Sequence, residues 1–407
     1  MTNANILNPC QHGFLPGHST CTNLLESLND WTSYKNQKNT TRVVFIDFAK
    51  AFDVISHNKL LYKLSCYGVN DSILNIIACF LKDRFQRVRI GNTLSKPLHM
   101  CSGVPQGSVL GPLLFIIYLN DLANILPRGL TPKFFADDAK IYTQIDSDTD
   151  ADNLQYGLDE IVCWSDTWQL PMSIDKCLTL DFHCKMKQDY YSNFIECNSL
   201  TTMEYAKDLG ITIDENLSFS RHIACIVAKA KIRISQIFRC FTTLRINELV
   251  LAYKSYVLPL LNYCSPVWSP CDITSINLLE SVQKYFIKRL LPYNSSNYLS
   301  KIDTLNLPTL EKLRLWADLS LCYKILNKQI SIAADEIGLH INKRTSRGNS
   351  LKLIIQYSRL DVRKNFFSVR VCKPWNCLPD DIINASSVLT FKKKLRLFNL
   401  NNFLIFT

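Results

Sequence analysis

Short apolar runs separated by polar stretches dominate the first half of the chain. Val43–Ile46 is one such run, and it predicts a buried strand that ends at the carboxylate of Asp47. Apolar residues then recur at roughly helical spacing from Phe52 to Leu64, and more regularly from Ile73 to Leu81. The pattern therefore predicts a strand followed by two helices.

A hairpin is predicted after these helices. The second helix is expected to be capped by Asp71 or Ser72, both of which have short polar side chains. Residues 87–90 and 97–100 flank Gly91-Asn92, a pair typical of tight turns. We therefore expect two antiparallel strands around this turn.

Two acidic residues stand between apolar segments further on. A loop at residues 103–107 contains two glycines and a proline and leads into an apolar helix expected over 109–126. Two short strands, 133–135 and 139–142, are predicted on either side of Asp137-Asp138. The pattern places carboxylates at the ends of buried strands.

Helical spacing dominates after residue 220. Apolar residues recur from Ile223 to Ile237 with lysine and arginine between them, which predicts an amphipathic helix. We place a domain boundary near residue 220 and a weaker one near 330–345. Strands mixed with helices, followed by a helical half, indicate the α+β class.

Composition is that of a folded protein with a sizeable core. The chain has 407 residues, of which 47% are hydrophobic and 20% charged, enough for two or three domains. No apolar run approaches the roughly 20 residues of a membrane span, and no secretion signal is found at the N-terminus. The sixteen cysteines include no CxxC pair. They are expected to be small buried residues in a reducing compartment.

Charge divides the chain into two unlike halves. Residues 1–220 carry 18 Lys and Arg against 24 Asp and Glu, a balance of −6, whereas residues 221–407 carry 28 against 11, a balance of +17. An acidic half suits metal ions and a basic half suits a polyphosphate backbone. A merely solvated basic surface is the alternative, and charge does not separate the two.

The strand-end acids have a chemical use as a group. Two metal ions about 3.5–4 Å apart can hold the attacking and the leaving oxygen of a phosphoryl transfer, and such ions need carboxylate ligands. Asp47 at one strand end and Asp137-Asp138 between two strands could supply them. An Asp-Asp pair alone is more often an ordinary turn.

Three motifs in order make a resemblance specific. Residues 45–53 (FIDFAKAFD), 102–112 (SGVPQGSVLGP) and 135–138 (FADD) resemble motifs A, B and C of the reverse transcriptases of non-LTR retrotransposons, the jockey-type LINE class. Further resemblances lie in the fingers motif at 11–20, motif D at 168–180, motif E at 208–211, and two C-terminal segments, 263–268 and 367–379.

The resemblance implies roles for the acidic residues. Asp47 and Asp137 would hold two Mg²⁺ ions, or Mn²⁺ in their place, with Asp138 in support. The backbone carbonyl of Phe48 would be a further ligand, and Lys176 would act on the leaving pyrophosphate. Asp53 is expected to form hydrogen bonds or to lie at a helix start and not to bind metal.

Other roles concern the nucleotide and the primer. Phe52 stands at the position that excludes a 2′-hydroxyl and so favours dNTPs, although its spacing also suits a helix core. Gln106 and Gly107 would shape the nucleotide site. Leu209 and Gly210 would form the primer grip.

The resemblance also implies the architecture, a right-hand polymerase. We expect partial fingers at 1–40, a palm with an antiparallel sheet and packed helices at 41–220 with an inserted fingers segment at about 57–100, a basic helical thumb at 221–335, and a small C-terminal region at 336–407. Relative to the family, the chain is expected to be truncated, with an endonuclease domain encoded upstream.

The predicted function is RNA-directed DNA polymerase, with an RNA template, a DNA primer and dNTPs as partners and a nuclear or cytoplasmic location. The alternative is a truncated, catalytically impaired nucleic-acid-binding protein. An RNA-dependent RNA polymerase and an intron maturase fit the motifs less well. Basic residues expected along the template are Lys82, Arg84, Arg87, Arg89 and Lys96.

Overall fold

The computed structural model describes residues 6–182, 192–241, 245–292, 296–342 and 351–406. The chain forms two compact units. Unit 1 consists of Met1–Asn23 and Lys38–Glu204, and unit 2 consists of Leu24–Gln37 and Tyr205–Thr407. The division after Glu204 lies before the expected boundary near 220, because the hairpin that follows packs against the first long helix of unit 2. The boundary expected at 330–345 runs into residues 343–350, which lie outside the described residues.

Unit 1 is built on a five-stranded sheet with the order β11-β8-β1-β7-β6. The strands are β1 (Thr41–Ile46), β6 (Thr131–Phe135), β7 (Asp138–Gln144), β8 (Leu178–Phe182) and β11 (Thr201–Met203). All pairs are antiparallel except β8 with β11. The predicted apolar strand is the central strand β1, which is buried at five of its six positions because sheet neighbours lie on both sides.

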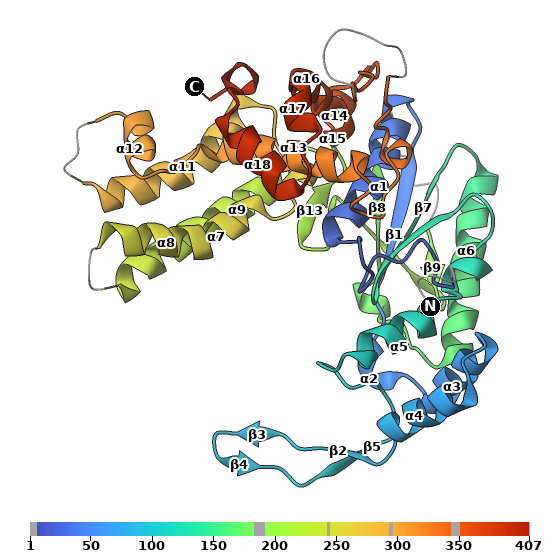
Figure 1. Ribbon diagram of the computed structural model, residues 1–407. Coiled ribbons are helices and arrows are strands. Elements are labelled where there is room, and N and C mark those ends of the chain that lie inside the picture. Colours follow the sequence, from blue (N-terminus) through green and yellow to red (C-terminus); the bar gives the residue numbers. More distant parts are fainter. Residues whose placement is uncertain (1–5, 183–191, 242–244, 293–295, 343–350, 407) are drawn as a thin grey trace. The chain divides into compact units, whose positions relative to one another are not determined.

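Helices supply the rest of the core of unit 1 (Figure 1). The helices of this unit are the start of α1 (Thr20–Asn36), then α2 (Ala51–Val54), α3 (His57–Cys66), α4 (Asp71–Leu81), α5 (Leu110–Leu119) and α6 (Asp148–Trp168). Short 3₁₀ turns are η2 (Leu122–Ile125) and η3 (Ile174–Lys176). The apolar sequence of α5 leaves it no polar face, and seven of its ten residues are buried. The helix predicted over 109–126 is thus shorter than expected. α5 ends at Leu119, and the 3₁₀ turn η2 follows it.

The predicted cap of α4 was wrong by one residue. Asn70 is the N-cap, and its side chain accepts a hydrogen bond from the backbone N–H of Ser72. Asparagine is as good a cap as aspartate or serine, so the sequence offered three neighbouring candidates for one position.

A buried lysine ties α3 to α5 and α6. The Nζ of Lys63 donates to Asp121 Oδ1 at 2.6 Å and lies 3.7 Å from the ring centre of Trp168. Burial lowers the pKa of Lys63 to about 8, against the opposing effect of Asp121. The charge is thus held by a carboxylate and an aromatic face, which fixes the helices that support the sheet.

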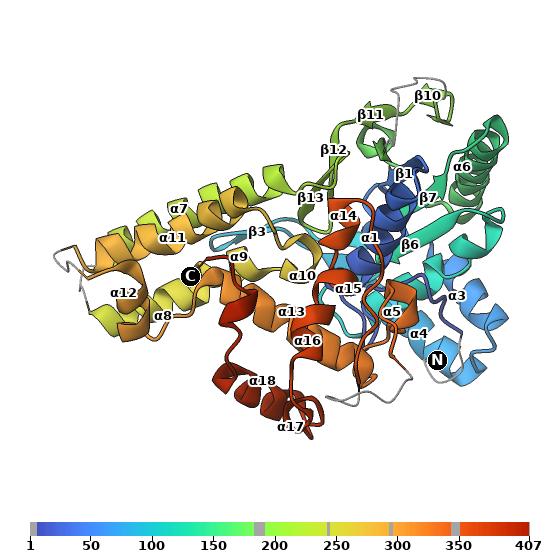
Figure 2. The same ribbon diagram turned by 90° about the horizontal axis from the view of Figure 1, so that it is seen from above.

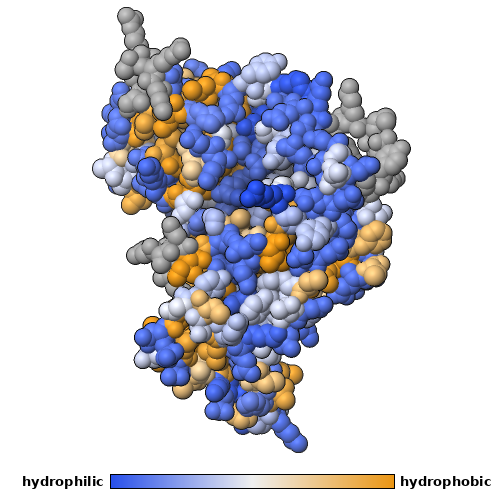
Figure 3. All heavy atoms as spheres, turned by 90° about the vertical axis from the view of Figure 1, so that its right-hand side faces the viewer, coloured by the Kyte–Doolittle hydropathy of each residue, from blue (hydrophilic) through white to orange (hydrophobic). Residues whose placement is uncertain are grey.

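The predicted hairpin is confirmed, with different strand limits. β3 (Arg89–Ile90) pairs with β4 (Thr93–Leu94) around the predicted turn, and β2 (Arg84–Gln86) pairs with β5 (Leu98–Met100). The hairpin extends from α4 (Figure 1) and exposes hydrophobic and basic side chains together. Figure 3 shows hydrophilic and hydrophobic residues mixed at the lower end of the face that it draws. A second small hairpin consists of β9 (Phe194–Ile195) and β10 (Asn198–Ser199).

Unit 2 contains most of α1, then one hairpin, and is otherwise mostly helical. The hairpin pairs β12 (Tyr205–Asp208) with β13 (Ile211–Asp214). The helices of the middle part are α7 (Ser220–Cys240), α8 (Ile246–Tyr256), α9 (Leu258–Asn262), α10 (Ser265–Trp268), α11 (Ile273–Leu290), α12 (Tyr298–Thr304) and α13 (Leu310–Leu326). The last part holds η4 (Asp335–Ile337), α14 (Asp361–Lys364), α15 (Phe367–Arg370), α16 (Cys372–Asn376), α17 (Asp380–Ile383), α18 (Val388–Leu397) and η5 (Asn401–Phe403).

The amphipathic helix predicted after residue 220 is α7. Its apolar stripe from Ile223 to Ile237 is buried, and α11 packs beside it, as Figures 1 and 2 show. The expected α+β class is confirmed by a largely antiparallel sheet in unit 1 and helices in unit 2. Among the described residues, no helix is both long and apolar enough to cross a membrane.

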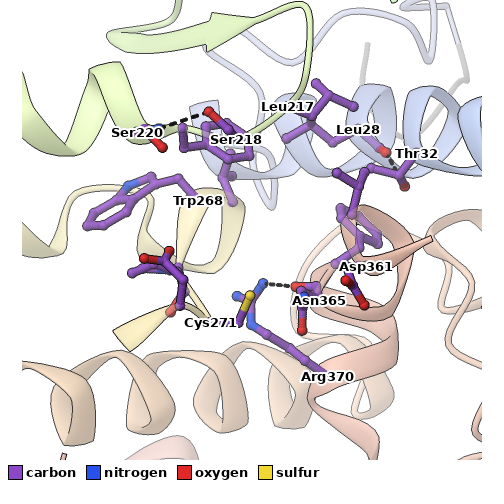
Figure 4. A pocket seen from close by; sticks show the side chains of 17 residues that line it. Leu28, Thr32, Leu217, Ser218, Ser220, Trp268, Cys271, Asp361, Asn365 and Arg370 are labelled. Carbon is purple, nitrogen blue, oxygen red and sulfur yellow. Dashed lines mark hydrogen bonds between the residues drawn. The ribbon is translucent and has the colours of Figure 1, made fainter. Parts of the chain in front are cut away.

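The two family-like C-terminal segments contact each other through one arginine. Arg370 donates to both carboxylate oxygens of Asp318 at 2.9 Å and to the carbonyl of Pro266 at 2.8 Å. It borders a pocket of about 230 Å³ and donates there to the carbonyl of Asn365 (Figure 4). Since these partners compensate its charge, Arg370 organises the packing of the helices around the pocket.

Candidate active site

Two of the three predicted metal ligands meet at one end of the sheet. Asp47 follows the last residue of β1, and Asp137 lies in the turn between β6 and β7. β1 pairs with β7 along its whole length, with Ile46 opposite Ala139, so the turn lies beside Asp47. Partial burial and, to a smaller extent, the nearby charge of Asp47 raise the pKa of Asp137. The two carboxylates therefore repel each other.

The turn that carries Asp137 is held by the N-terminal segment. Ala136 has a φ of +57°, a left-handed conformation that costs an alanine energy. The side-chain oxygen of Gln11 accepts hydrogen bonds from the N–H groups of Ala136, at 2.9 Å, and Gly13, at 2.7 Å. A Cβ on Gly13 would lie 2.3 Å from the nitrogen of Ala136, so only glycine allows this approach.

Asp138 is placed differently from Asp137. It is the exposed first residue of β7 and pairs with Phe135. Within the described ranges, no three His, Cys, Asp or Glu side chains gather as a metal-binding group. The structure thus brings together Asp47 and Asp137, and the role of Asp138 as a third ligand stays a prediction.

Lys176 lies next to the first of these acids. Its Nζ donates to Asp47 Oδ2 at 2.9 Å, and this hydrogen bond, followed by the charge of Asp47, raises the pKa of Lys176. The lysine side chain is 69% exposed, so the pair is open to solvent and contributes little stability.

The donor set fits a hard divalent cation. Carboxylate oxygens are the ligands that Mg²⁺ and Mn²⁺ prefer, and Mg²⁺ commonly binds through one or two of them. Burial and, to a smaller extent, the charge of Asp47 raise the pKa of Asp137, although Lys176 donates to Asp47. A cation between the two carboxylates would remove that cost.

Backbone contacts fix the segment that follows Asp47. The carbonyl of Asp47 accepts from the N–H of Ser173 at 2.8 Å, and the N–H of Ala49 donates to Pro171 at 2.8 Å. The ring of Phe48 is 3% exposed and packs on Trp164, with ring centres 6.3 Å apart. Only the backbone of Phe48 is thus available for the ligand role predicted for it.

The loop at 103–107 rests on α2. Val104 N donates to the carbonyl of Phe52, and Ser102 Oγ donates to that of Asp53 at 2.9 Å. Asp53 Oδ1 accepts from Gln106 Nε2 at 3.0 Å, so Asp53 forms hydrogen bonds, as expected. Gln106 is thereby held at the rim of a pocket of about 360 Å³ that also includes Arg84.

The family model for reverse transcriptase (RNA-dependent DNA polymerase) matches residues 1–213, a little over half of the chain. The chain belongs to this family. The expected family is thus confirmed.

Its relatives include polymerases of mobile elements. A probable RNA-directed DNA polymerase from transposon BS of Drosophila melanogaster is 30% identical over 302 residues, which is 70% of this chain and 32% of the relative. The RNA-directed DNA polymerase from mobile element jockey of the same species is 28% identical over 290 residues, 69% and 31% of the two chains. The chain spans about a third of the length of these relatives.

Solved structures of telomerase are similar to a lower degree. The telomerase of Candida albicans, in complex with a fragment of telomeric RNA, is 14% identical with a TM-score of 0.37, over 75% of this chain and 51% of that chain. The telomerase of Candida tropicalis, in a similar complex, is 9% identical with a TM-score of 0.40, over 92% and 52%.

Four further residues were predicted to contact the nucleotide or the primer. Phe52 is half-buried and stacks on Phe115, with ring centres 4.1 Å apart. Gly107 has a φ of +81° and open space around it. Leu209 and Gly210 form the turn of the β12–β13 hairpin in unit 2.

Sequence reasoning missed three residues that support these motifs. Gln11 and Gly13 lie in the recognised fingers motif, but neither was given a role there, because their contact with Ala136 joins residues 125 positions apart. Tyr263 was likewise without a role, and its hydroxyl donates to the carbonyl of Leu209 at 2.9 Å. Its position in a family-like C-terminal segment was the available signal.

Proposed function

We propose that the chain is the polymerase part of an RNA-directed DNA polymerase, which adds dNTPs to a DNA primer on an RNA template. The observation that carries the proposal is the meeting of Asp47 and Asp137 at the sheet end. Because the chain belongs to the reverse transcriptase family, we assign a nucleotidyl transfer to this pair of carboxylates. The names fingers, palm, thumb and C-terminal region, with their expected boundaries, are part of this proposal, as is a nuclear or cytoplasmic location.

The residues of the site have distinct proposed tasks. Two Mg²⁺ or Mn²⁺ ions, held by Asp47 and Asp137 with Asp138 in support, would act as Lewis acids on the transferred phosphoryl group. Lys176, now on Asp47, is long enough and exposed enough to turn toward a leaving pyrophosphate. Gln106, fixed by Asp53, would orient the incoming nucleotide.

The proposal predicts metal-dependent extension of a primer. The purified chain, given an RNA template, a DNA primer, dNTPs and Mg²⁺ or Mn²⁺, is expected to lengthen the primer, and EDTA is expected to stop it. The control is Asp47→Asn, which keeps the size of the side chain and removes one charge. Binding of primer–template without extension in any metal would instead support the impaired nucleic-acid-binding protein.

The predicted role of Phe52 in favouring dNTPs over NTPs can be tested by substitution. In Phe52→Val, the room made beside the sugar is expected to raise incorporation of NTPs relative to dNTPs by about tenfold or more, the scale on which one apolar contact discriminates. The ratio of kcat/KM for the two substrates measures this. Phe115→Leu is the matched control, since it removes the same ring stack from the buried side. Equal changes in both variants would mean that Phe52 acts only in the core.

A further inference from the structure

A basic pocket lies on the helices α13 and α18 of unit 2. It has a volume of about 340 Å³, and its wall includes Lys324, Lys392 and Arg396 but no aspartate or glutamate. Lys324 lies in the last turn of α13. Lys392 and Arg396 are four residues apart on α18 and so project from the same side of that helix.

The three cations are not compensated. Within the described part of the chain, none of them forms an ion pair or a hydrogen bond, whereas Lys394 on the same helix pairs with Asp381 at 3.3 Å. Burial and, after it, the charges of Lys324 and Arg396 lower the pKa of Lys392. Lys392 and Arg396 are exposed, so solvent screens part of their mutual repulsion, and a bound anion would neutralise the charge that remains.

An indole completes the wall of the pocket. Trp316 borders it, and the guanidinium of Arg396 lies 6.0 Å from the centre of its ring. In the described ranges, the buried Nε1 of Trp316 and the buried Oδ1 of Asn262, another residue of the wall, make no hydrogen bond. The pocket thus combines positive charge, a flat aromatic side chain and unsatisfied polar atoms.

We infer that this pocket binds a nucleotide of a single-stranded nucleic acid, with its phosphate on Lys324, Lys392 and Arg396 and its base against Trp316. Lysine and arginine neutralise backbone phosphates, and stacking on an aromatic ring adds affinity with little dependence on sequence. The inference rests on the proposed function in one respect only, namely that such a polymerase encounters single-stranded nucleic acid. Binding here needs neither the carboxylates nor dNTPs.

Anisotropy of a labelled oligouridylate, measured with the full chain in EDTA, tests the charges. Lys392→Gln with Arg396→Gln is expected to weaken binding about tenfold and to reduce the slope of log Kd against log salt by about 1.4, or 0.7 for each lost contact. The matched control is Lys373→Gln with Lys393→Gln, which removes two exposed charges outside the pocket and should change Kd less than twofold. Equal losses in both pairs would overturn the inference.

Trp316 separates a nucleotide from a bare anion. Trp316→Leu is expected to weaken binding about fivefold or more, as loss of one stacked base does, while Trp316→Phe should retain most of it. Polyphosphate as competitor should be little affected by either change. If Trp316→Leu left the oligouridylate Kd unchanged, the pocket would bind phosphate alone and the nucleotide inference would be wrong. An oligothymidylate run in parallel reports whether the strand is RNA or DNA.

Failure of this inference can be told apart from failure of the proposed function. The binding assay contains no metal, so a chain that does not extend primers can still show the difference between the pocket variants and their control. Conversely, a chain that extends primers with unchanged binding in the pocket variants would refute the pocket alone.

Discussion

Asp137→Asn is expected to abolish primer extension and to make the protein more stable at neutral pH. Extension should fall at least about a thousandfold, because several kcal/mol of transition-state stabilisation depend on the metal ions that Asp137 helps to hold. Stability should rise, because the partly buried carboxylate is repelled by Asp47 and an amide of the same size is not. The gain is below about 1 kcal/mol, since Asp137 is only half-buried and solvent screens its charge.

The pH dependence of that gain has a defined sign. The pKa of Asp137 in the folded protein is raised above its ordinary value of 3.8. Its ionisation therefore opposes folding, and the wild type loses stability as pH rises from about 3.8 through the raised pKa. The difference in Tm between Asp137→Asn and wild type should be fully present at pH 7 and should shrink as pH is lowered toward 4.

Calorimetry at several pH values, beside an extension assay at pH 7, measures both effects. Asp175→Asn is the matched control, because Asp175 is an exposed acid of the same unit, next to Lys176, and its loss should change neither quantity appreciably. Mn²⁺ should raise the Tm of wild type more than that of Asp137→Asn, by linkage. Undiminished extension by Asp137→Asn would contradict the proposed metal role.

The sequence predicted the site where it depends on a repeated local pattern. Val43–Ile46 is apolar throughout because β1 has a strand on each side, so both the strand and the acid after it were predictable. The turn around Asp137 was predictable for the same reason, since β6 and β7 are partly or fully buried along most of their length. Local burial thus determined the parts that hold the carboxylates.

Long-range hydrogen bonds were not predictable in the same way. The contact of Gln11 with Ala136 and that of Lys176 with Asp47 join residues more than a hundred positions apart. Neither contact produces a periodic pattern in the sequence, because each involves one polar side chain and one backbone or carboxylate group. The hairpin strands, too, could be located only approximately, since their exposed side chains follow no alternation between core and solvent.

Gly103→Ala is expected to be the most disruptive single-methyl change in the loop that carries Gln106. A Cβ at Gly103 would lie 2.6 Å from the carbonyl oxygen of Asp53 and 2.8 Å from its Cα. Gly103 N also donates to Ile55 at 2.8 Å, so the loop cannot move away without losing a bond to the end of α2. Its φ of +82° adds the strain of a left-handed alanine.

Gly107→Ala is the control that separates the steric clash from the backbone strain. Gly107 has a φ of +81° but nothing within 4 Å of its Cβ position. Both variants bear about 1–2 kcal/mol of backbone strain, but Gly103→Ala bears about 1–3 kcal/mol more from overpacking. Urea unfolding of the full chain should therefore show Gly103→Ala as the less stable by that difference. Since the clash falls on Asp53, which holds Gln106, the KM for dNTP should rise in Gly103→Ala beyond what Asp53→Asn produces. Equal loss of stability in the two glycine variants would mean that the loop is free of α2, and Gln106 would then have no fixed position from which to orient a nucleotide.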